Sequence, residues 1–423
     1  MRKLEQKYPA DIAVVGVHSG KFTEERVSAN IRDASLRLGA AHPTINDRQF
    51  RMWRAYAVRS WPTLVVVSPR AYVVGMHAGE FEAEAIAPFI DRVVDEARAS
   101  GTLDAREIRF PADAPSAVAD VLAFPGKVAA DGNRVAIADS GHHRVIIGTV
   151  EPDAARMSTA RIVVGDAAGF RDGSQPRFNN PQGLAFHGET LFIADAGNHA
   201  IRALELATGI VRTVAGTGRQ ARSSADIAAG AMSSPWDVAY DAGLLYVAMA
   251  GAHQLWTVDV ASGAAVVHSG SGAEELHDGA HAAAALAQPM GVGIAGNAIY
   301  FADSESSAIR IADRDRSGGV RTIVGTGLFD FGDDDGIGDS VRLQHPQGVA
   351  CAPDGRLLVA DSYNGSLKWV DPSSRRVTTW LRGLHEPSGV AIAGGWVFVA
   401  ESNRHRIVVA QLDSEDIAEL RFV

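Results

Sequence analysis

One short sequence pattern recurs six times along the carboxy-terminal part of this 423-residue chain. Each copy has an apolar, β-prone run, a small residue, an acidic residue, a polar turn and a second apolar run. Self-similarity at a fixed period is the signature of a repeat architecture, and a copy of this length predicts a β-propeller. The copies are Val135–Ile146, Phe192–Arg202, Tyr246–Trp256, Tyr300–Arg310, Leu358–Lys368 and Phe398–Val408.

Each repeat opens with a proline, and in four of the six copies the opening is Pro-x-Gly followed by an apolar residue. We interpret this glycine as the residue that supplies the positive φ of a tight turn. The stretches Pro125-Gly126 and Pro235-Trp236-Asp237 depart from the pattern. The opening prolines are Pro125, Pro181, Pro235, Pro289, Pro346 and Pro387.

Four antiparallel strands are predicted in each repeat, so residues 117–423 should form an all-β propeller of six blades. The fourth strand is expected at the runs 161–165, 211–216, 265–270, 320–325 and 377–381. In the last blade, Asp416–Phe422 should be the outer strand, with Glu107–Phe110 beside it to close the ring.

Residues 1–100 have a different character, because short apolar runs alternate with segments of helical periodicity, which indicates an α/β layer. Residues 101–116 are rich in Gly, Pro, Asp and Ala and are predicted to be a linker. Helices are expected at Arg2–Tyr8, Ser28–Leu38, Arg48–Val58 and Phe81–Ala99, and strands at Ile12–His18, Pro62–Val67 and Ala71–Gly79.

Two known families resemble parts of this chain. The turns Asn198–Ile201 and Asn403–Ile407 resemble the NHL repeat, and Ser60–Leu64 resembles the thioredoxin-like fold. The resemblance implies that Pro62 is the cis-proline that precedes a central strand of that fold. The combination is similar to the NHL repeat-containing protein 2 family, on the stretches Lys7–Phe22, His42–Trp53 and Ser60–Val67. That family also implies a β-rich domain beyond Val423, so we expect a chain shortened at both ends.

The amino-terminal segment departs from the thioredoxin-like pattern in its chemistry. The family requires a Cys-x-x-Cys turn at the start of its first helix, and this segment contains no cysteine. Because Arg2–Tyr8 resembles the tail of that helix, the strand between Ile12–His18 and Thr63–Val67 is expected to be absent. Three explanations are open: a true start upstream, a fragment, or another segment in the gap. Thiol–disulfide chemistry is excluded for the sequence as written.

The composition restricts the class of protein. The formal charge of −10 argues against binding to nucleic-acid phosphates or to an anionic membrane surface. The single cysteine, Cys351, excludes an internal disulfide and favours a reducing compartment. No apolar stretch is long enough for a membrane-spanning helix, and the start lacks the pattern of a signal peptide. We therefore expect a cytoplasmic protein.

The acidic residue of each repeat is the first candidate for a functional role. These residues could ring a ligand or cation on one propeller face, or each could accept hydrogen bonds from backbone N–H groups of its own turn. Recurrence in nearly every blade favours the structural role. The positions are Asp139, Asp195, Asp303, Asp361 and Glu401, with Met249 as the exception.

Two further groups invite a metal-site interpretation. The repeat histidines should lie on separate blades, where each is expected to pack within its own turn rather than to bind zinc. The run Asp333–Asp335 has the oxygen ligands that a divalent cation prefers, but a solvated acidic loop is favoured. No cofactor and no catalytic residue are nominated. The histidines are His143, His199, His253 and His405.

The leading function predicted from the sequence is a non-catalytic interaction protein. Its long loops between blades should share a face with the turns between second and third strands, and that face should meet a protein or peptide partner. Two alternatives stay open: a redox protein whose cysteine site lies upstream of this chain, and a metal-dependent propeller hydrolase or lyase.

Overall fold

The computed structural model describes residues 1–423 except 41, 105–120, 152, 154, 159–161 and 413. The chain divides into two compact units, Met1–Val118 and Ala119–Val423. Most of the predicted linker, and the predicted strand Glu107–Phe110, lie outside the described residues. No helix in the described part of the chain has the length and apolar character needed to cross a bilayer.

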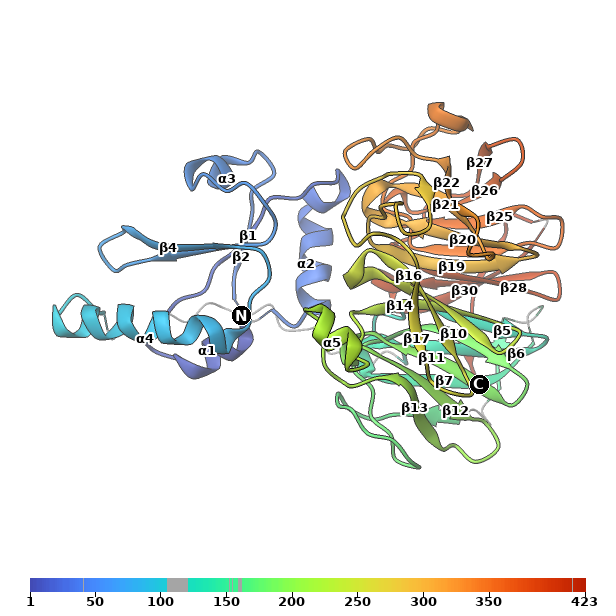
Figure 1. The fold of residues 1–423 in the computed structure, drawn as a ribbon, viewed down its shortest axis with the longest axis horizontal. Helices are drawn as coiled ribbons and strands as arrows, with labels where there is room; N and C mark the ends of the chain where they lie inside the picture. Colours follow the sequence, from blue (N-terminus) through green and yellow to red (C-terminus); the bar gives the residue numbers. More distant parts are fainter. Residues whose placement is uncertain (41, 105–120, 152, 154, 159–161, 413) are drawn as a thin grey trace. The chain divides into compact units, whose positions relative to one another are not determined.

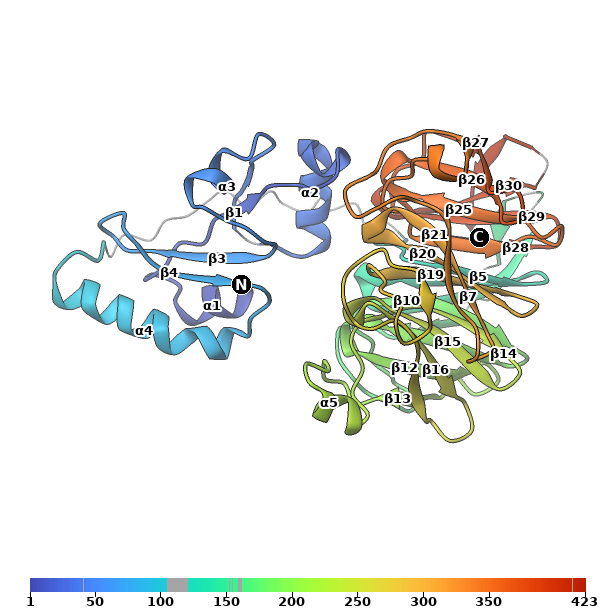
Figure 2. The same ribbon diagram turned by 45° about the horizontal axis from the view of Figure 1, so that its top comes forward.

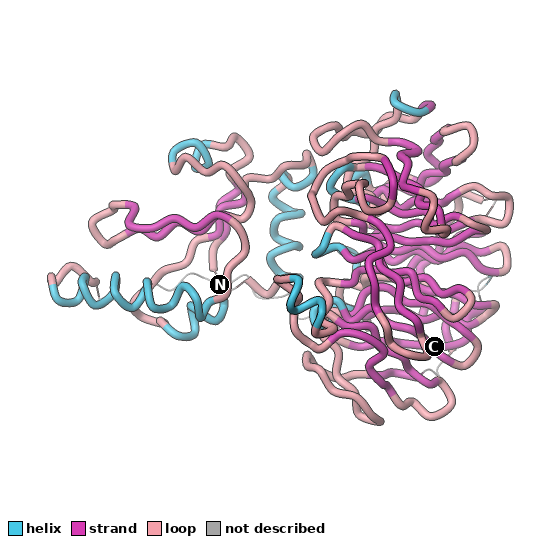
Figure 3. Tube along the Cα trace, viewed as in Figure 1, coloured by secondary structure: helices cyan, strands magenta, loops and turns pink. Residues whose placement is uncertain are grey.

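The larger unit is a β-propeller with six blades, each built on an antiparallel sheet (Figures 1 and 3). From the innermost strand outward, the first blade contains β5 (Val128–Asp131), β6 (Arg134–Asp139), β7 (Arg144–Glu151) and β9 (Ile162–Val164). The second blade contains β10 (Pro181–His187), β11 (Thr190–Asp195), β12 (Ala200–Glu205) and β13 (Val211–Gly216). The third blade contains β14 (Pro235–Asp241), β15 (Leu244–Met249), β16 (Gln254–Asp259) and β17 (Ala265–Ser269).

The remaining three blades follow the same order. The fourth blade contains β19 (Pro289–Ala295), β20 (Ala298–Asp303), β21 (Ala308–Asp313) and β22 (Gly319–Val324). The fifth blade contains β24 (Gly348–Cys351), β25 (Leu357–Asp361), β26 (Ser366–Asp371) and β27 (Arg376–Leu381). The sixth blade contains β28 (Pro387–Ala393), β29 (Trp396–Glu401), β30 (Arg406–Gln411) and β31 (Ile417–Glu419). Two-residue strands β18 (Gly279–Ala280) and β23 (Gly336–Ile337) add a fifth strand at the outer edges of the fourth and fifth blades.

The ring closes through the end of the chain. We predicted one outer strand over Asp416–Phe422, and this was wrong in part, because the segment is shared between two blades. β31 pairs with β30 in the last blade, whereas β32 (Arg421–Phe422) pairs in parallel with β8 (Arg156–Met157), which extends the first blade. Side chains of both blades form one buried apolar cluster that includes Ile137 and Phe398.

The glycine of the Pro-x-Gly opening has a different purpose from the one we inferred. Gly183, Gly291, Gly348 and Gly389 do not have a positive φ, so turn conformation does not require them. A Cβ at Gly291 would lie 2.6 Å from the Gln347 carbonyl oxygen of the next blade. At Gly183, Gly291 and Gly389 the opening of the neighbouring blade therefore approaches too closely for a side chain unless the backbone shifts. The positive φ belongs instead to the residue just before each proline: Phe124, Asn180, Ser234, Gln288, His345 and Glu386.

The smaller unit combines helices with two separate two-stranded sheets. β1 (Gly16–His18) pairs in parallel with β2 (Thr44–Asn46), and β3 (Thr63–Val67) pairs antiparallel with β4 (Val73–Ala78). Among the described residues, β1 and β3 are not joined in one sheet. The helices are α1 (Arg2–Lys7), α2 (Ser28–Arg37), α3 (Arg51–Ala55) and α4 (Ala83–Ala99).

Helices α1 and α4 pack against each other around a small core of the amino-terminal unit (Figure 2). Leu4 and Tyr8 of the α1 segment are buried against Ile90 and Val94 of α4. The Tyr8 hydroxyl donates to the Ala87 carbonyl oxygen at 3.0 Å. The Trp61–Pro62 peptide bond, which precedes β3, is cis.

Candidate functional site

The five acidic repeat residues are fully buried, and each makes the same contact in its own blade. One carboxylate oxygen accepts a hydrogen bond from the backbone N–H two residues before the opening proline. The distance is 2.8 Å from Asn179 N to Asp195 Oδ1 and 2.7 Å from His385 N to Glu401 Oε1. The donor lies in the segment that opens the blade, not in the acidic residue's own turn. The others are Asp139 with Ala123, Asp303 with Ala287 and Asp361 with Gln344.

The second oxygen of each carboxylate faces a cation of the same blade. Asp195 Oδ2 lies 2.7 Å from Arg202 Nη1, and Asp303 Oδ2 lies 2.8 Å from Arg310 Nη1. Asp361 Oδ2 is 3.9 Å from Lys368 Nζ, because that ammonium is shared with other carboxylates. In the third blade Met249 replaces the acid, and Gln254 and Trp256 stand where other blades carry the cation. The five blades with the acidic residue therefore also carry the cation, and the third blade lacks both.

Burial changes the acidity of these groups. It raises the pKa of the Asp195 carboxyl to about 6 and that of Asp361 to about 7, against the hydrogen bonds that favour the charged forms. It also raises the pKa of Asp303. Because the oxygen atoms already have partners and are closed to solvent, this geometry favours a structural role for all five positions.

The repeat histidines join neighbouring blades. We expected each one to pack within its own turn, and this was wrong. Each follows a short 3₁₀ turn in a left-handed conformation, which aims its ring at the next blade. There, Nδ1 accepts the backbone N–H of the residue before the next proline, at 3.1 Å from Asn180 to His143 and 3.0 Å from Ser234 to His199. The other pairs are Gln288 with His253 and Phe124 with His405.

A recurring Asp-Gly pair, which we did not predict from the sequence, anchors three of the long loops. Asp172, Asp278 and Asp335 each accept hydrogen bonds from the backbone and hydroxyl of a threonine on their own blade's outer strand. Each also pairs with the cation that faces the buried acid of that blade. The signal was available, since Asp-Gly stands in all three loops.

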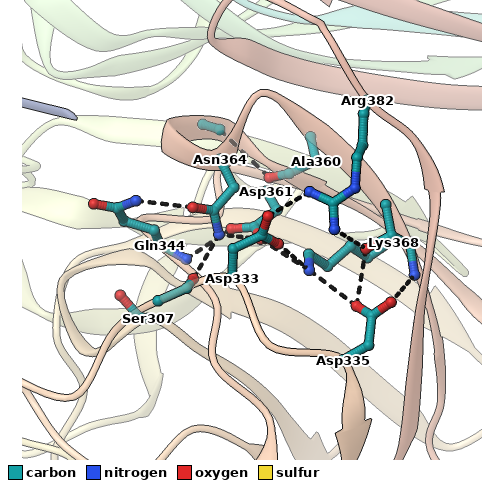
Figure 4. A network of polar contacts seen from close by, with 12 residues as sticks. Ser307, Asp333, Asp335, Gln344, Ala360, Asp361, Asn364, Lys368 and Arg382 are labelled. Atoms are coloured by element: carbon teal, nitrogen blue, oxygen red, sulfur yellow. Dashed lines mark hydrogen bonds and ion pairs between the residues drawn. The ribbon is translucent and has the colours of Figure 1, made fainter. Parts of the chain in front are cut away.

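The fifth blade shows this anchor in its fullest form (Figure 4). Lys368 Nζ lies 2.6 Å from Asp333 Oδ1 and 3.0 Å from Asp335 Oδ1. Arg382 forms a second ion pair with Asp333. We favoured a solvated loop over a cation site for Asp333–Asp335, and all three residues are exposed. The ion pairs were not expected: Lys368 and Arg382 neutralise two of the three carboxylates.

The turns and long loops lie on one propeller face, where they are hydrogen-bonded to each other. Asn198 Nδ2 of a turn donates to the Gly169 carbonyl oxygen at 2.7 Å, and Asn364 Nδ2 donates to that of Gly332 at 2.6 Å. The loops are therefore fixed both to their blades and to the turns. Within the described ranges, no group of three His, Cys, Asp or Glu side chains is close enough to hold a metal ion.

The propeller axis carries the two residues that break the Pro-x-Gly pattern. Lys127 and Asp237 stand where four blades have glycine, and their charged groups lie 3.4 Å apart, Nζ to Oδ2. They line a cavity of about 490 Å³ whose wall comes from the inner strands of all six blades. The repeat pattern alone does not predict a charged pair at this position.

Comparison with known proteins agrees with the repeat architecture. The family profile described as NHL repeat matches residues 343–370, which cover the turn and strands around Asp361. NHL repeat-containing protein 2 of Bos taurus is 34% identical over 466 residues, covering 96% of this chain and 63% of that protein. The chain is an NHL-repeat protein homologous to NHL repeat-containing protein 2.

Another relative is also similar over nearly the whole chain. Protein SUPPRESSOR OF QUENCHING 1, chloroplastic, of Arabidopsis thaliana is 37% identical over 456 residues, covering 99% of this chain and 43% of that protein. The chain thus spans about two fifths to two thirds of the length of these relatives. A solved nidogen/laminin complex has a chain with a TM-score of 0.48 and 14% identity, covering 66% of this chain and 89% of that one.

Proposed function

We propose that this NHL-repeat protein is a non-catalytic interaction protein whose long-loop face binds a protein or peptide partner. The observation that carries the proposal is the anchoring of the loops, because Arg202, Arg310 and Lys368 tie three of them to their blades. A loop that is already ordered loses less conformational entropy on binding than a mobile one. Such a face is preorganised for recognition.

Exposed apolar side chains on these loops fit the same function. Phe170, Ile227 of helix α5 (Ser224–Ala228) and Phe329 are all solvent-exposed, Phe329 by 70%. Aromatic and apolar side chains framed by polar residues are the usual anchors of protein interfaces. Charges of both signs are next to them in the sequence, at Arg171, Asp226 and Asp330, and would give specificity.

The test compares two sets of exposed apolar residues. The variant Ile227→Ser/Phe329→Ser should lose at least one partner captured by the wild-type chain, at an unchanged melting temperature. The control variant Ile210→Ser/Val266→Ser changes two exposed residues on or beside outer strands that do not belong to the long loops. Loss of the same partner in both variants, or retention in both, would contradict the proposal.

The amino-terminal unit is proposed as a second docking or structural module with a thioredoxin-like fold. A reducing compartment, the cytoplasm, is proposed for the chain. Cys351 supports this, because a chain with a single cysteine cannot form an internal disulfide. The name of the Arabidopsis relative supplies the alternative, a chloroplast. Microscopy of the tagged full-length protein in its own cells would distinguish the two.

A further inference from the structure

The two exceptions to the Pro-x-Gly pattern carry opposite charges and meet at the axis. Neither residue is required by the fold, since four blades have glycine at the same position. A Cβ at Gly389 would lie 2.7 Å from Lys127 Cα, so space here is tightly restricted. Placing two ionisable side chains at such a position costs desolvation free energy. That cost points to a purpose other than blade packing.

The pair is incompletely hydrogen-bonded. Asp237 accepts the backbone N–H of Val238 at 2.9 Å and that of Val292 at 3.2 Å. Among the described residues, Lys127 Nζ donates one hydrogen bond, to the Gln347 carbonyl oxygen. An ammonium has three N–H donors, and a carboxylate has about four acceptor positions. Both charged groups therefore retain capacity for a further partner.

The distance between Lys127 Nζ and Asp237 Oδ2 also indicates that the two groups can each accommodate a further partner. Charge-assisted N–H···O hydrogen bonds are usually about 2.7–2.9 Å long, whereas Lys127 and Asp237 are 3.4 Å apart. The side chains are only 4% and 12% exposed. Burial lowers the pKa of the Lys127 amine and raises that of the Asp237 carboxyl. The surroundings thus compensate both charges poorly, and a charged occupant beside them would correct that.

The cavity beside the pair has the volume of a small-molecule site. Its volume of about 490 Å³ lies within the range of about 300–1,000 Å³ found for ligand pockets. Leu184, Val349 and Val390 are among the residues that line it, and it extends to the hairpin turn at Gly188. The six inner strands each have a sheet neighbour on one side only, so the other edge of each strand faces the axis.

We propose that the axial cavity binds a small zwitterion of the amino-acid type. The ligand carboxylate accepts from Lys127, the ligand ammonium donates to Asp237, and an apolar side chain lies along the wall. A site of two opposite charges is complementary to a ligand that carries both, because either charge alone would meet one repulsive partner. The site is separate from the long-loop face, so the two proposals can fail independently.

The first experiment uses three matched probes on the full chain. L-leucine carries both charges, 4-methylpentanoate lacks the ammonium, and 3-methylbutylamine lacks the carboxylate. Calorimetric titration should show leucine binding, with each single-charge probe weaker by about tenfold or more, since each loses one charged hydrogen bond. Equal binding of either single-charge probe would overturn the proposal. So would the absence of binding by all three, which would mean that water alone fills the cavity.

A second experiment uses the repeat's own residue as the replacement. Lys127→Gly/Asp237→Gly restores the Pro-x-Gly pattern of the other blades and should abolish leucine binding. The control Arg356→Gln removes a partly exposed charge in the hairpin between β24 and β25 and should bind normally. Retained binding in the glycine variant would overturn the proposal.

A third measurement needs no variant at the axis. Leucine should slow acetylation of Lys127 in the wild-type chain, followed by mass spectrometry, relative to exposed Lys3. If leucine left the acetylation rate of Lys127 unchanged, the proposal would fail even where the glycine variant did not fold.

Discussion

His405 of the last blade accepts a hydrogen bond at Nδ1 from the backbone N–H of Phe124 in the first blade, at 3.0 Å. The same bond joins consecutive blades elsewhere, as from Ser234 to His199. The seam of the ring is therefore built like its other joints. Two serine hydroxyls strengthen it, since Ser402 Oγ donates to the Pro125 carbonyl oxygen at 2.6 Å and Ser388 Oγ to that of Gly126 at 2.5 Å.

Replacing His405 should weaken this seam. His405→Ala leaves the buried N–H of Phe124 without an acceptor and removes a ring contact at 4.3 Å, so the free energy of unfolding should fall by about 1–3 kcal/mol. His199→Ala should cost a similar amount at an internal joint. Ser307→Ala should cost less, because its bond from His345 N is longer, 3.3 Å. Urea unfolding measures all three, and an unchanged midpoint for His405→Ala would contradict the role.

The close approach of blade openings gives a second prediction. Gly183→Ala places a Cβ in overlap with the Cα of Asp237, and overpacking of this kind should cost about 1–3 kcal/mol. Gly348→Ala is the matched control, since the new Cβ would meet its nearest neighbour, the Ala360 Cβ, at 3.1 Å, which is a milder overlap than at Gly183. In thermal unfolding, the melting temperature of Gly183→Ala should be lower than that of Gly348→Ala. The opposite order would show that steric approach is not the reason for glycine.

The propeller itself was predictable because the strands of each blade can be recognised in the local sequence of that blade. The predicted run 211–216 is β13, and the predicted 377–381 differs from β27 by one residue. Local alternation of apolar residues and turn residues sets these elements, and the repeat sets their number. Contacts between blades were not predictable in the same way, because the partner lies far along the chain.

The histidines and the axis illustrate that limit. From the sequence, His143 has no visible connection with Asn180, which it meets only because the blades stack. Likewise, Lys127 and Asp237 stand out as departures from a pattern, but their pairing depends on which blades face each other across the ring. The sequence shows that Asp335 belongs to an acidic run and that Lys368 ends one copy of the repeat, but it does not show that the two side chains form an ion pair. Only the fold shows that one neutralises the other.

The shared ammonium of Lys368 gives a third prediction. Lys368→Met leaves Asp361 buried without a cation and removes a partner from Asp333 and Asp335. Breaking a buried ion pair on one side typically costs about 3–5 kcal/mol, so this variant should unfold at a clearly lower urea concentration. Backbone amides of the 333–336 loop should also exchange faster with solvent.

Blades two and four supply the control for that substitution. Arg202 and Arg310 occupy the same repeat position, so Lys368→Arg should keep both the stability and the slow exchange of the loop. If Lys368→Arg were as damaging as Lys368→Met, the effect would come from crowding rather than from charge, and the network would not be the anchor of the loop.

Asp361 should make the stability of the propeller depend on pH in an unusual direction. Burial raises its pKa to about 7 in the folded chain, compared with about 3.9 when unfolded. Between these values the folded state holds a proton that the unfolded state lacks. The stability contributed by this group is therefore complete below about pH 4 and is lost as pH rises through about 7.

The variant Asp361→Asn cannot titrate, so it isolates this effect. The free energy of unfolding of the wild type, minus that of Asp361→Asn, should fall between about pH 5 and about pH 7, by ~1.4 kcal/mol for each step of one in pH. Asp195→Asn should show the same sign over a window that ends nearer pH 6, in line with the pKa of Asp195. Asp333 and Asp335 have lowered pKa values, so their contribution is lost on acidification below about pH 4 and lies outside the window. A difference that increased with pH would mean that the cation partners outweigh burial and that Asp361 is ionised throughout.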